Sequence, residues 1–345
     1  MSTAASASRH WAESPKPDVS FNDATGAYGP ARLLGDIGGT NARFAWQDAA
    51  GEPLRDIATL PTADHTSLAA AIAHYLHGLE RTAPPWCAIG IANPITGDRV
   101  QMTNNHWSFS ITAMQRELGF ARLVVINDFT ALALALPELS PAETRQVGGG
   151  PAVAGSPLAL IGPGTGLGVS GLLPGAKPGL WLPLQGEGGH VTLAASTARE
   201  AAVLELLRQR HGHASAERAI SGMGLEGLYS AVCALDAVAG FTPLPAAEIS
   251  RRALAASDAQ CVEVLDLFSG FLGSVAGNLA LTLGSRGGVY IGGGIVPRLG
   301  DAFERSRFRA CFEDKGRFRT YLEAIPVFVI HADVSPALVG VARAL

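Results

Sequence analysis

The sequence predicts an α/β protein of two similar lobes, with a ligand cleft between them. Strand-like and helix-like segments alternate along the chain, which is typical of α/β folds. Two glycine-rich strand–turn–strand units, at residues 33–45 and 157–173, each open one half of the chain and indicate an internal duplication. At 345 residues, 41 of them glycine, the chain is long enough for two lobes and rich in the residue that tight turns use.

The elements of the first half follow from short apolar runs that end at polar residues. Residues 32–36 and 42–47 form strands around the first turn, and residues 66–80 carry apolar side chains at helical spacing. The next segments are a strand that ends at Pro94 ("CAIGIANP"), a helix ("ITAMQREL"), a buried strand ("LVVIND") and a helix closed by Pro137 ("FTALALALP"). This order predicts a βββαβα lobe.

The second half repeats the opening pattern of strand, Gly/Thr turn and strand in "PLALIGPGTGLGVSGLL". A long helix near 197–211, further helices and a last strand at 289–291 follow. The uncharged stretch 267–285 just reaches membrane-spanning length, but Ser, Thr and Asn interrupt it, so we expect a buried core helix. Residues 1–30 lack periodicity and are expected to form a disordered extension outside the fold.

Composition excludes several classes of partner. A net charge of −4 without a basic block argues against nucleic acid. The four cysteines lack CxxC or Cys/His spacing, which indicates buried thiols in a reducing compartment and neither a disulfide framework nor a zinc site. The first residues lack the apolar run of a signal peptide. We therefore expect a cytoplasmic protein with no membrane partner.

The first turn, in "LLGDIGGTNARFA", carries more polar groups than a hairpin needs, although a plain tight hairpin stays open for this stretch alone. Its glycines allow close approach of the backbone, so backbone N–H groups and Thr40 can hold phosphate while Asp36 faces Mg²⁺ through water. The turn "GPGTGLG" supplies a second cradle, and three glycines after residues 289–291 admit a base or ribose. The predicted nucleotide-binding residues are Gly35, Asp36, Ile37, Gly38, Gly39, Thr40, Asn41, Gly164, Thr165, Gly166, Gly292, Gly293 and Gly294.

Acid–base candidates lie in three further segments. Asn127 and Asp128 end an apolar strand, where α/β folds present ligands, although Asp128 can instead cap the following helix. Glu187 and His190 stand in the turn "GEGGH", where the alternatives are a solvated glutamate beside a satisfied histidine, or an incomplete metal pair. Glu217 precedes the expected helix end at residues 221–222, and its alternative is an ordinary first-turn glutamate.

Together these side chains suit a sugar site. Sugar hydroxyls need both hydrogen-bond donors and acceptors, which amides, carboxylates and imidazole supply. One carboxylate must also accept the proton of the attacking hydroxyl. An actin-like or chaperone-like ATPase needs no such cluster.

These motifs resemble the bacterial glucokinase family over about residues 32–345. They occur in the family's order: "GDIGGTNARFA", "ITGDRVQMTNNHWSFS", "INDFTALALALP", "GPGTGLGV", "GEGGHV", "SAERAISGMGLEGLY", "GGVYIGGGIVPR" and "FEDKGRF". The resemblance implies the two-lobed actin-like ATPase (ribonuclease H-like) fold, with a small lobe of residues 31–138 plus 329–345 and a large lobe of residues 139–328. It also implies a cytoplasmic homodimer that uses ATP and Mg²⁺ to convert glucose to glucose 6-phosphate, the first step of glycolysis.

Carried over by motif, the resemblance makes Asp128 the general base for in-line phosphoryl transfer to the 6-hydroxyl. It places five further residues around the sugar: Asn104, Asn127, Glu187, His190 and Glu217. Asn93 in "IANPITG" departs from the small residue or cysteine expected there, and we expect it not to reach the chemistry. The cysteine-rich zinc motif of the related repressor/kinase family is absent, which argues against that branch.

Other functions stay open at the level of sequence. A kinase for mannose or fructose needs the same residue types, because discrimination between hexoses depends on their exact placement. A non-catalytic sugar sensor or an actin-like ATPase uses the same phosphate turns. A sensor that binds DNA, however, needs a helix-turn-helix, for which residues 1–30 are too short.

Overall fold

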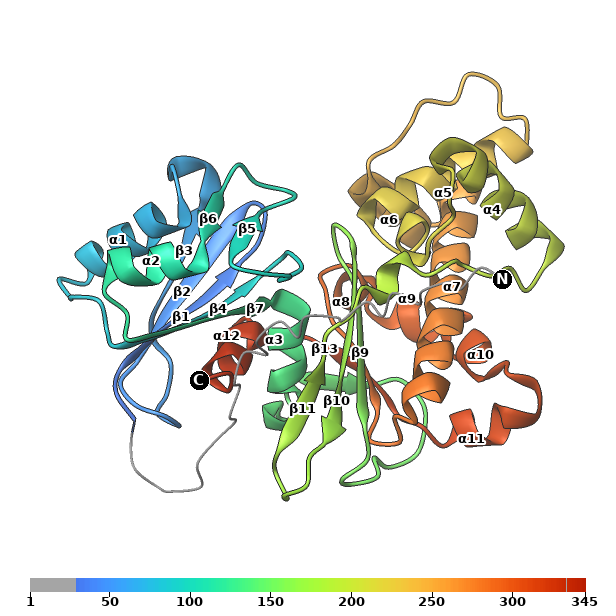
Figure 1. Ribbon diagram of the computed structural model, residues 1–345. Helices are drawn as coiled ribbons and strands as arrows, with labels where there is room; N and C mark the ends of the chain where they lie inside the picture. The colour runs from blue at the N-terminus through green and yellow to red at the C-terminus, as the bar shows by residue number, and fades with distance from the viewer. Residues whose placement is uncertain (1–28, 333) are drawn as a thin grey trace, which may run out of the picture.

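The computed structural model describes residues 29–332 and 334–345, so almost all of the predicted N-terminal extension lies outside the described residues. The described chain forms two α/β units side by side, each built on one mixed sheet (Figure 1). We name these the first sheet and the second sheet. The predicted α/β class with two duplicated halves is confirmed.

The first sheet has the strand order β3-β2-β1-β4-β7. Strand β1 pairs antiparallel with β2, which pairs antiparallel with β3, whereas β1, β4 and β7 run parallel. The strand bounds are β1 (Arg32–Ile37), β2 (Asn41–Gln47), β3 (Arg55–Pro61), β4 (Trp86–Ile91) and β7 (Arg122–Asn127). A separate hairpin consists of β5 (Arg99–Gln101) and β6 (Ser108–Ser110).

The second sheet has the order β11-β10-β9-β12-β13-β8, and its first five strands repeat the pairing directions of the first sheet. The bounds are β8 (Thr144–Gln146), β9 (Leu158–Pro163), β10 (Leu167–Pro174), β11 (Trp181–Leu184), β12 (Val289–Ile291) and β13 (Val327–Ile330). The sequence predicted that the strand at residues 289–291 is the last one. The structure differs, because β13 follows this strand, β12. The sequence of β13, "VFVI", is an apolar run too short for periodicity to separate strand from helix.

Both faces of the first sheet are buried, because side chains alternate between the faces along each strand. Leu33 and Phe44 point to one face and pack with α1 (Leu68–Gly78) and α2 (Ile111–Leu118). Leu34 points to the other face, which is covered by α3 (Asp128–Ala135) and α12 (Pro336–Ala342).

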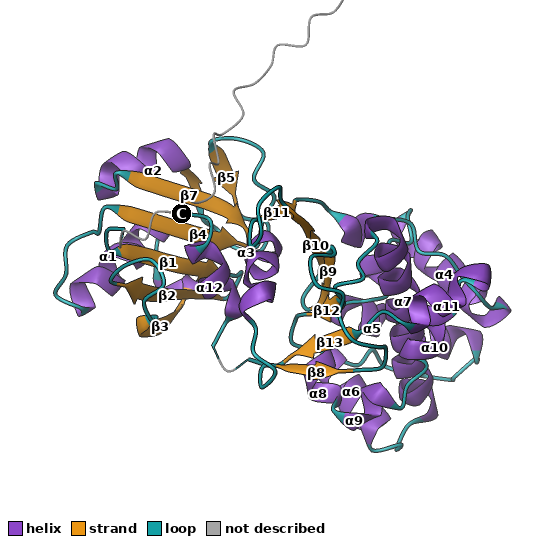
Figure 2. Cartoon of the chain, turned by 90° about the horizontal axis from the view of Figure 1, so that it is seen from below, coloured by secondary structure: helices purple, strands orange, loops and turns teal. Residues whose placement is uncertain are grey.

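Helices α3 and α12 lie between the two sheets (Figures 1 and 2). Helix α3 also packs on β10 and β11, where Leu134 joins Leu160 and Leu172 of the second sheet. The two helices cross closely, since a Cβ added at Gly340 of α12 would lie 1.7 Å from the carbonyl oxygen of Ala131. The lobe boundaries at 138/139 and 328/329 stay a prediction.

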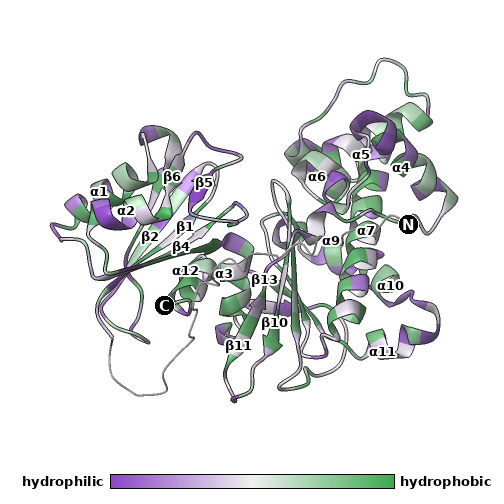
Figure 3. Ribbon diagram, viewed as in Figure 1, coloured by the Kyte–Doolittle hydropathy of each residue, from purple (hydrophilic) through white to green (hydrophobic). Residues whose placement is uncertain are grey.

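The remaining helices form one body on the second sheet around α7 (Ala259–Leu283). Within the described residues α7 is the one helix long and apolar enough to cross a membrane, yet 67% of its apolar window is buried among its neighbours. Figure 3 shows its apolar residues running between the surrounding helices, so the predicted core helix is confirmed. The other helices of this body are α4 (Ala198–His211), α5 (Gly222–Leu235), α6 (Ala246–Leu254), α8 (Val296–Leu299), α9 (Asp301–Glu304), α10 (Phe308–Glu313) and α11 (Arg319–Glu323).

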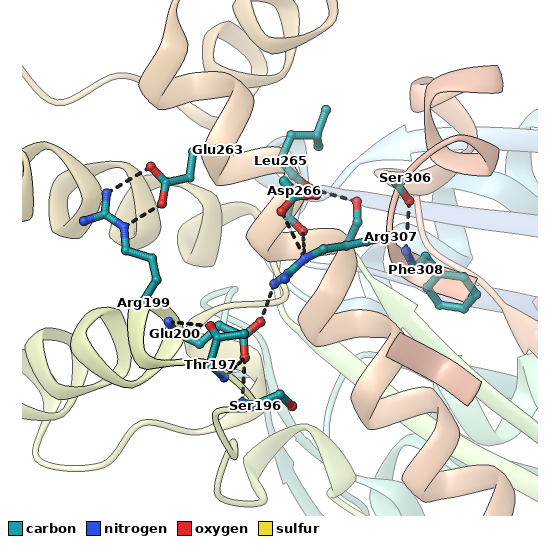
Figure 4. A network of polar contacts seen from close by, with 11 residues as sticks. Ser196, Thr197, Arg199, Glu200, Glu263, Leu265, Asp266, Ser306, Arg307 and Phe308 are labelled. Carbon is teal, nitrogen blue, oxygen red and sulfur yellow. Dashed lines mark hydrogen bonds and ion pairs between the residues drawn. The ribbon is translucent and has the colours of Figure 1, made fainter. Parts of the chain in front are cut away.

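A network of charges centred on Glu200 joins α4, α7 and α10 (Figure 4). The buried Glu200 carboxylate accepts hydrogen bonds from the N–H groups of Ser196 (2.6 Å) and Thr197 (3.2 Å) and pairs with Arg307. The Arg307 guanidinium also lies 3.0 Å from the carboxylate of Asp266. Glu200 thus completes the capping box that starts α4 and neutralises a partly buried arginine.

Candidate active site

The β1–β2 turn and the β9–β10 turn occupy equivalent places in the two sheets. In the first turn the Gly38 N–H donates to the Asn41 carbonyl at 2.9 Å, and in the second the Gly164 N–H donates to the Gly166 carbonyl at 2.8 Å. The Thr62 hydroxyl holds the first turn by donating to the Gly39 carbonyl at 2.8 Å. The repeat inferred from sequence therefore places the two predicted phosphate turns in the same structural position.

The other predicted nucleotide-binding residues of the first turn lie in strands. Gly35, Asp36 and Ile37 belong to β1 and Asn41 begins β2. Gly35 is buried inside the sheet, where an added Cβ would contact Ile89 and Phe44 at 3.4–3.5 Å. These are ordinary contact distances, so packing does not itself require glycine there.

Asp36 is nearly buried and has two hydrogen-bond donors. The hydroxyl of Ser335, the residue before α12, donates to Oδ2 at 2.7 Å, and Arg43 Nη1 lies 3.4 Å from the same oxygen. Sequence reasoning missed Ser335. The Ser-Pro pair marks a helix start, but it carries no sign of a partner 299 residues away.

Asn127 and Asp128 lie where β7 ends and α3 begins. The Asn127 side-chain oxygen accepts hydrogen bonds from the N–H groups of Phe129 (2.9 Å) and Thr130 (3.2 Å), so Asn127 is the N-cap of α3. Asp128 is the first helical residue, and its Oδ1 also accepts from the Phe129 N–H at 2.9 Å. The capping role that we weighed for Asp128 belongs mainly to Asn127.

The Asp128 carboxyl has an unusual environment. Burial, together with the negative charges of Asp36 and Glu187, raises its pKa to about 6, against the opposing effect of the Phe129 N–H. Asp36 comes from the first sheet and Glu187 from the second unit, so carboxylates of both halves act on Asp128. A carboxyl that titrates near neutral pH is suited to accept a proton.

Glu187 and His190 lie on a short 3-10 helix, η3 (Gly188–His190), and at the residue before it. Their closest side-chain atoms, Glu187 Oε2 and His190 Nε2, are 3.9 Å apart, and both side chains are more than half exposed. η3 packs on the start of β10, because a Cβ added at Gly189 would lie 2.1 Å from the Leu167 carbonyl oxygen. Both side chains thus stand beside the second turn.

Glu217, in η4 (Ala216–Arg218), contacts the second turn directly. Its Oε2 accepts a hydrogen bond from the Leu167 N–H at 2.9 Å, and a Cβ added at Gly166 would lie 2.5 Å from that oxygen. The expected helix end at residues 221–222 is wrong, because Ser221 is the N-cap that begins α5. The first N–H of α5, that of Gly222, donates to the Gly164 carbonyl at 2.9 Å.

The remaining predicted residues lie next to the two turns. Gly292 donates its N–H to the Ile161 carbonyl at 2.9 Å. Gly293 has a φ of 77°, and an added Cβ would lie 2.3 Å from the Pro163 carbonyl oxygen, so only glycine fits beside the second turn. A Cβ at Gly39 would lie 2.9 Å from the Asn104 carbonyl oxygen, which places Asn104 against the first turn.

The described side chains do not by themselves form a metal site of three or more ligands. Across residues 29–332 and 334–345, no group of three or more His, Cys, Asp or Glu side chains lies close enough to hold a metal ion. All four cysteines fall in this part of the chain and are unpaired; three are buried, as their spacing predicted, and Cys311 is only partly buried.

Comparison with known proteins gives concordant matches. The family model described as Glucokinase matches residues 33–345. A glucokinase of Aromatoleum aromaticum is 59% identical over 318 residues, covering 91% of this chain and 94% of the relative. A glucokinase of Chromobacterium violaceum is 54% identical over 316 residues, covering 91% and 89%. The crystal structure of a glucokinase from an Antarctic psychrotroph superimposes with a TM-score of 0.82 at 38% identity, covering 92% of this chain and 99% of that one.

The repeated sheets and the oxygen-rich residues around Asp128 define a sugar kinase of the actin-like ATPase fold. Within this class, the chain belongs to the glucokinase family. The fold and the family resemblance read from the sequence motifs are both confirmed.

Proposed function

We propose that Asp128 is the general base for transfer of the γ-phosphoryl group of ATP to the 6-hydroxyl of glucose, in a cleft between the two sheets. ATP-dependent phosphorylation of glucose is the activity of this glucokinase, and the alternatives of another hexose kinase or a non-catalytic sensor are not favoured. The observation that carries the role of Asp128 is its position as the first residue of α3, where β7 ends, and burial together with the charges of Asp36 and Glu187 raises its pKa there.

In this proposal the glucose hydroxyls bind to side chains around Asp128 and the two turns. Asn104, Asn127, Glu187, His190 and Glu217 supply hydrogen-bond donors and acceptors to them. Asp128 accepts the proton of the 6-hydroxyl as the new oxygen–phosphorus bond forms and the bond from the γ-phosphorus to ADP breaks. Exposure of Glu187 and His190 leaves both side chains free to turn toward a sugar.

The phosphates of ATP are assigned to the two equivalent turns, at residues 38–41 and 164–166, through Thr40 and through backbone N–H groups other than those of Gly38 and Gly164, which donate within their own turns. The nucleoside is assigned to residues 292–294, which lie beside the second turn. This arrangement needs no lysine, since successive N–H groups themselves form an anion site.

Mg²⁺ fits the side chains at the first turn. The ion usually binds one or two carboxylates with water and substrate phosphates, and Asp36 supplies one oxygen-donor side chain at the first turn. When bound with ATP, Mg²⁺ neutralises phosphate charge. We assign Asp36 to hold it through water, while Ser335 and Arg43 fix the carboxylate.

We also propose that the enzyme is a cytoplasmic homodimer. The family resemblance supports both statements, and the unpaired cysteines support a reducing compartment. Sedimentation at micromolar concentration tests the dimer, and a single species of monomer mass contradicts it.

The first test replaces Asp128 by asparagine, which keeps the size and removes the proton acceptor. We expect kcat for glucose to fall about 10²–10⁴-fold, with glucose affinity by calorimetry nearly unchanged. Asp301→Asn is the matched control, because that aspartate is exposed on α9. Turnover of Asp128→Asn close to that of the native enzyme rules out Asp128 as the base.

A sugar panel tests the substrate. A coupled assay with Mg²⁺-ATP compares glucose, mannose, fructose, galactose and N-acetylglucosamine, each beside a control without sugar. We expect turnover confined largely to glucose. ATP hydrolysis that is independent of sugar contradicts the kinase assignment.

A further inference from the structure

We infer that Asn93 is a positioning residue that sets the geometry of the sugar site without contacting the substrate; this inference rests on the proposed sugar-binding roles of Asn104 and Asn127. The residue lies in the loop that follows β4, between the first turn and the head of α3. Sequence reasoning expected Asn93 to stay apart from the chemistry.

The side chain of Asn93 holds the segment that carries Asn104. Its Oδ1 accepts two hydrogen bonds from Thr103, one from the backbone N–H at 3.1 Å and one from the hydroxyl at 3.0 Å. Thr103 directly precedes Asn104, whose backbone packs on Gly39 of the first turn. Loss of this oxygen therefore frees the segment at its point of contact with the site.

The backbone of the same loop contacts two more segments of the site. The Asn93 carbonyl accepts a hydrogen bond from Asn127 Nδ2 at 3.4 Å, and Asn127 in turn caps the helix that begins with Asp128. The preceding N–H, that of Ala92, donates to the Ile37 carbonyl at 2.9 Å, at the start of the first turn. One loop thus links the first turn, the Asn104 segment and the head of α3.

Other contacts hold the remainder of the β5–β6 hairpin, so the hydrogen bonds of Asn93 fix only the tip of this hairpin. At the base, Asp98 accepts from the Ser110 hydroxyl at 2.5 Å and from the Thr112 N–H at 2.8 Å. On the far side of the tip, the buried Trp107 donates its indole N–H to the His65 carbonyl at 3.0 Å. Replacement of Asn93 should therefore displace residues 103–104 and leave the hairpin folded.

The test compares Asn93→Ala with Asn93→Asp, which keeps an oxygen acceptor of the same length. For Asn93→Ala we expect the KM for glucose to rise about five- to tenfold, as for loss of one or two hydrogen bonds, with the KM for ATP unchanged. Asn93→Asp should restore most of the glucose affinity. Gln146→Ala is the control. Gln146 lies on the outer strand β8, and its side-chain amide also holds a loop by donating to the carbonyls of residues 148–150.

The outcomes separate this inference from the proposed site. An unchanged KM for glucose in Asn93→Ala, or an equal defect in Asn93→Asp, overturns the positioning role. An equal rise of the KM for glucose in Gln146→Ala also overturns it. So does an activity loss in Asn93→Ala that is fully explained by a lower melting temperature. Asn104→Ala and Asp128→Asn are measured alongside. If neither variant changes KM or kcat, the site assignment itself fails. If both variants change them and Asn93→Ala does not, only the role of Asn93 fails.

Discussion

Asp128 illustrates how a single residue acquires its chemistry from neighbours distant in sequence. Burial, Asp36 and Glu187 favour its protonated form, and the Phe129 N–H favours the carboxylate. The balance leaves a pKa of about 6, high for an aspartate and close to the pH at which a general base works well.

The pH dependence of the reaction follows from this balance. A general base acts only when ionised, so kcat/KM for glucose should fall about tenfold per pH unit below about pH 6 and stay level just above pH 7. A steady-state pH profile measures this limb, and the residual activity of Asp128→Asn should lack it. A flat profile through pH 6 in the native enzyme contradicts the assignment.

The sequence was a better guide to which residues lie around Asp128 than to the hydrogen bonds that they form. Asn127 and Asp128 were found because they end an apolar strand, a position that is visible in the sequence. Which of the two caps α3 was not visible, since both are short side chains able to accept an N–H hydrogen bond. Ser335 and Asn93 were missed because their contacts depend on how distant segments fold together.

At the scale of elements, the strands around the two glycine turns were predictable because apolar runs with polar ends define them. The β5–β6 hairpin and β13 were not, because each strand is only three or four residues long and, unlike the equally short β12, is not followed by a run of glycines that marks its end. The repeat of pairing directions explains why two turns with little sequence in common occupy equivalent positions.

The crossing of α3 and α12 predicts an intolerant glycine. Gly340→Ala would place a methyl group 1.7 Å from the Ala131 carbonyl oxygen, so we expect the free energy of unfolding to fall by about 1–3 kcal/mol or more. Gly78→Ala in α1 is the control, because an added Cβ there meets nothing within 4 Å and alanine favours a helix. Urea titration measures both, and equal stability of the two variants contradicts the close crossing.

The Glu200 network predicts a second contrast, between two glutamates of α4. Glu200→Ala leaves Arg307 without its buried partner and removes the capping box, so we expect a loss of about 3–5 kcal/mol in unfolding free energy. Glu205→Ala breaks an exposed pair with Arg208 and should change little. Thermal and urea unfolding distinguish them; a Glu200→Ala protein as stable as Glu205→Ala would show that the network does not stabilise the fold.

The whole molecule joins its two units through α3, which touches both sheets, while α12 packs on α3 and on the first sheet. Asp128 stands at the head of α3, where a strand of the first sheet ends, whereas Glu187 precedes η3, which packs on β10 of the second sheet. A sugar that contacts both should draw the units together and exclude water from the transferred phosphoryl group.

Small-angle scattering tests this closure. We expect a smaller radius of gyration with saturating glucose than without it. Asp128→Asn should compact in the same way, because the variant keeps the sugar contacts. No compaction of the native enzyme by glucose contradicts closure.

The position of α12 also bears on how a ribosome delivers this protein. Asp36 and Ser335 are 299 residues apart, yet they hydrogen-bond, and α12 packs on the strand that carries Asp36. The apolar face formed by Leu34, Ala45 and Ala88 therefore lacks one of its two covering helices while almost all of the second unit is translated. The half that emerges first is the last to be completed, so the nascent chain must keep that face from aggregating until the final helix arrives.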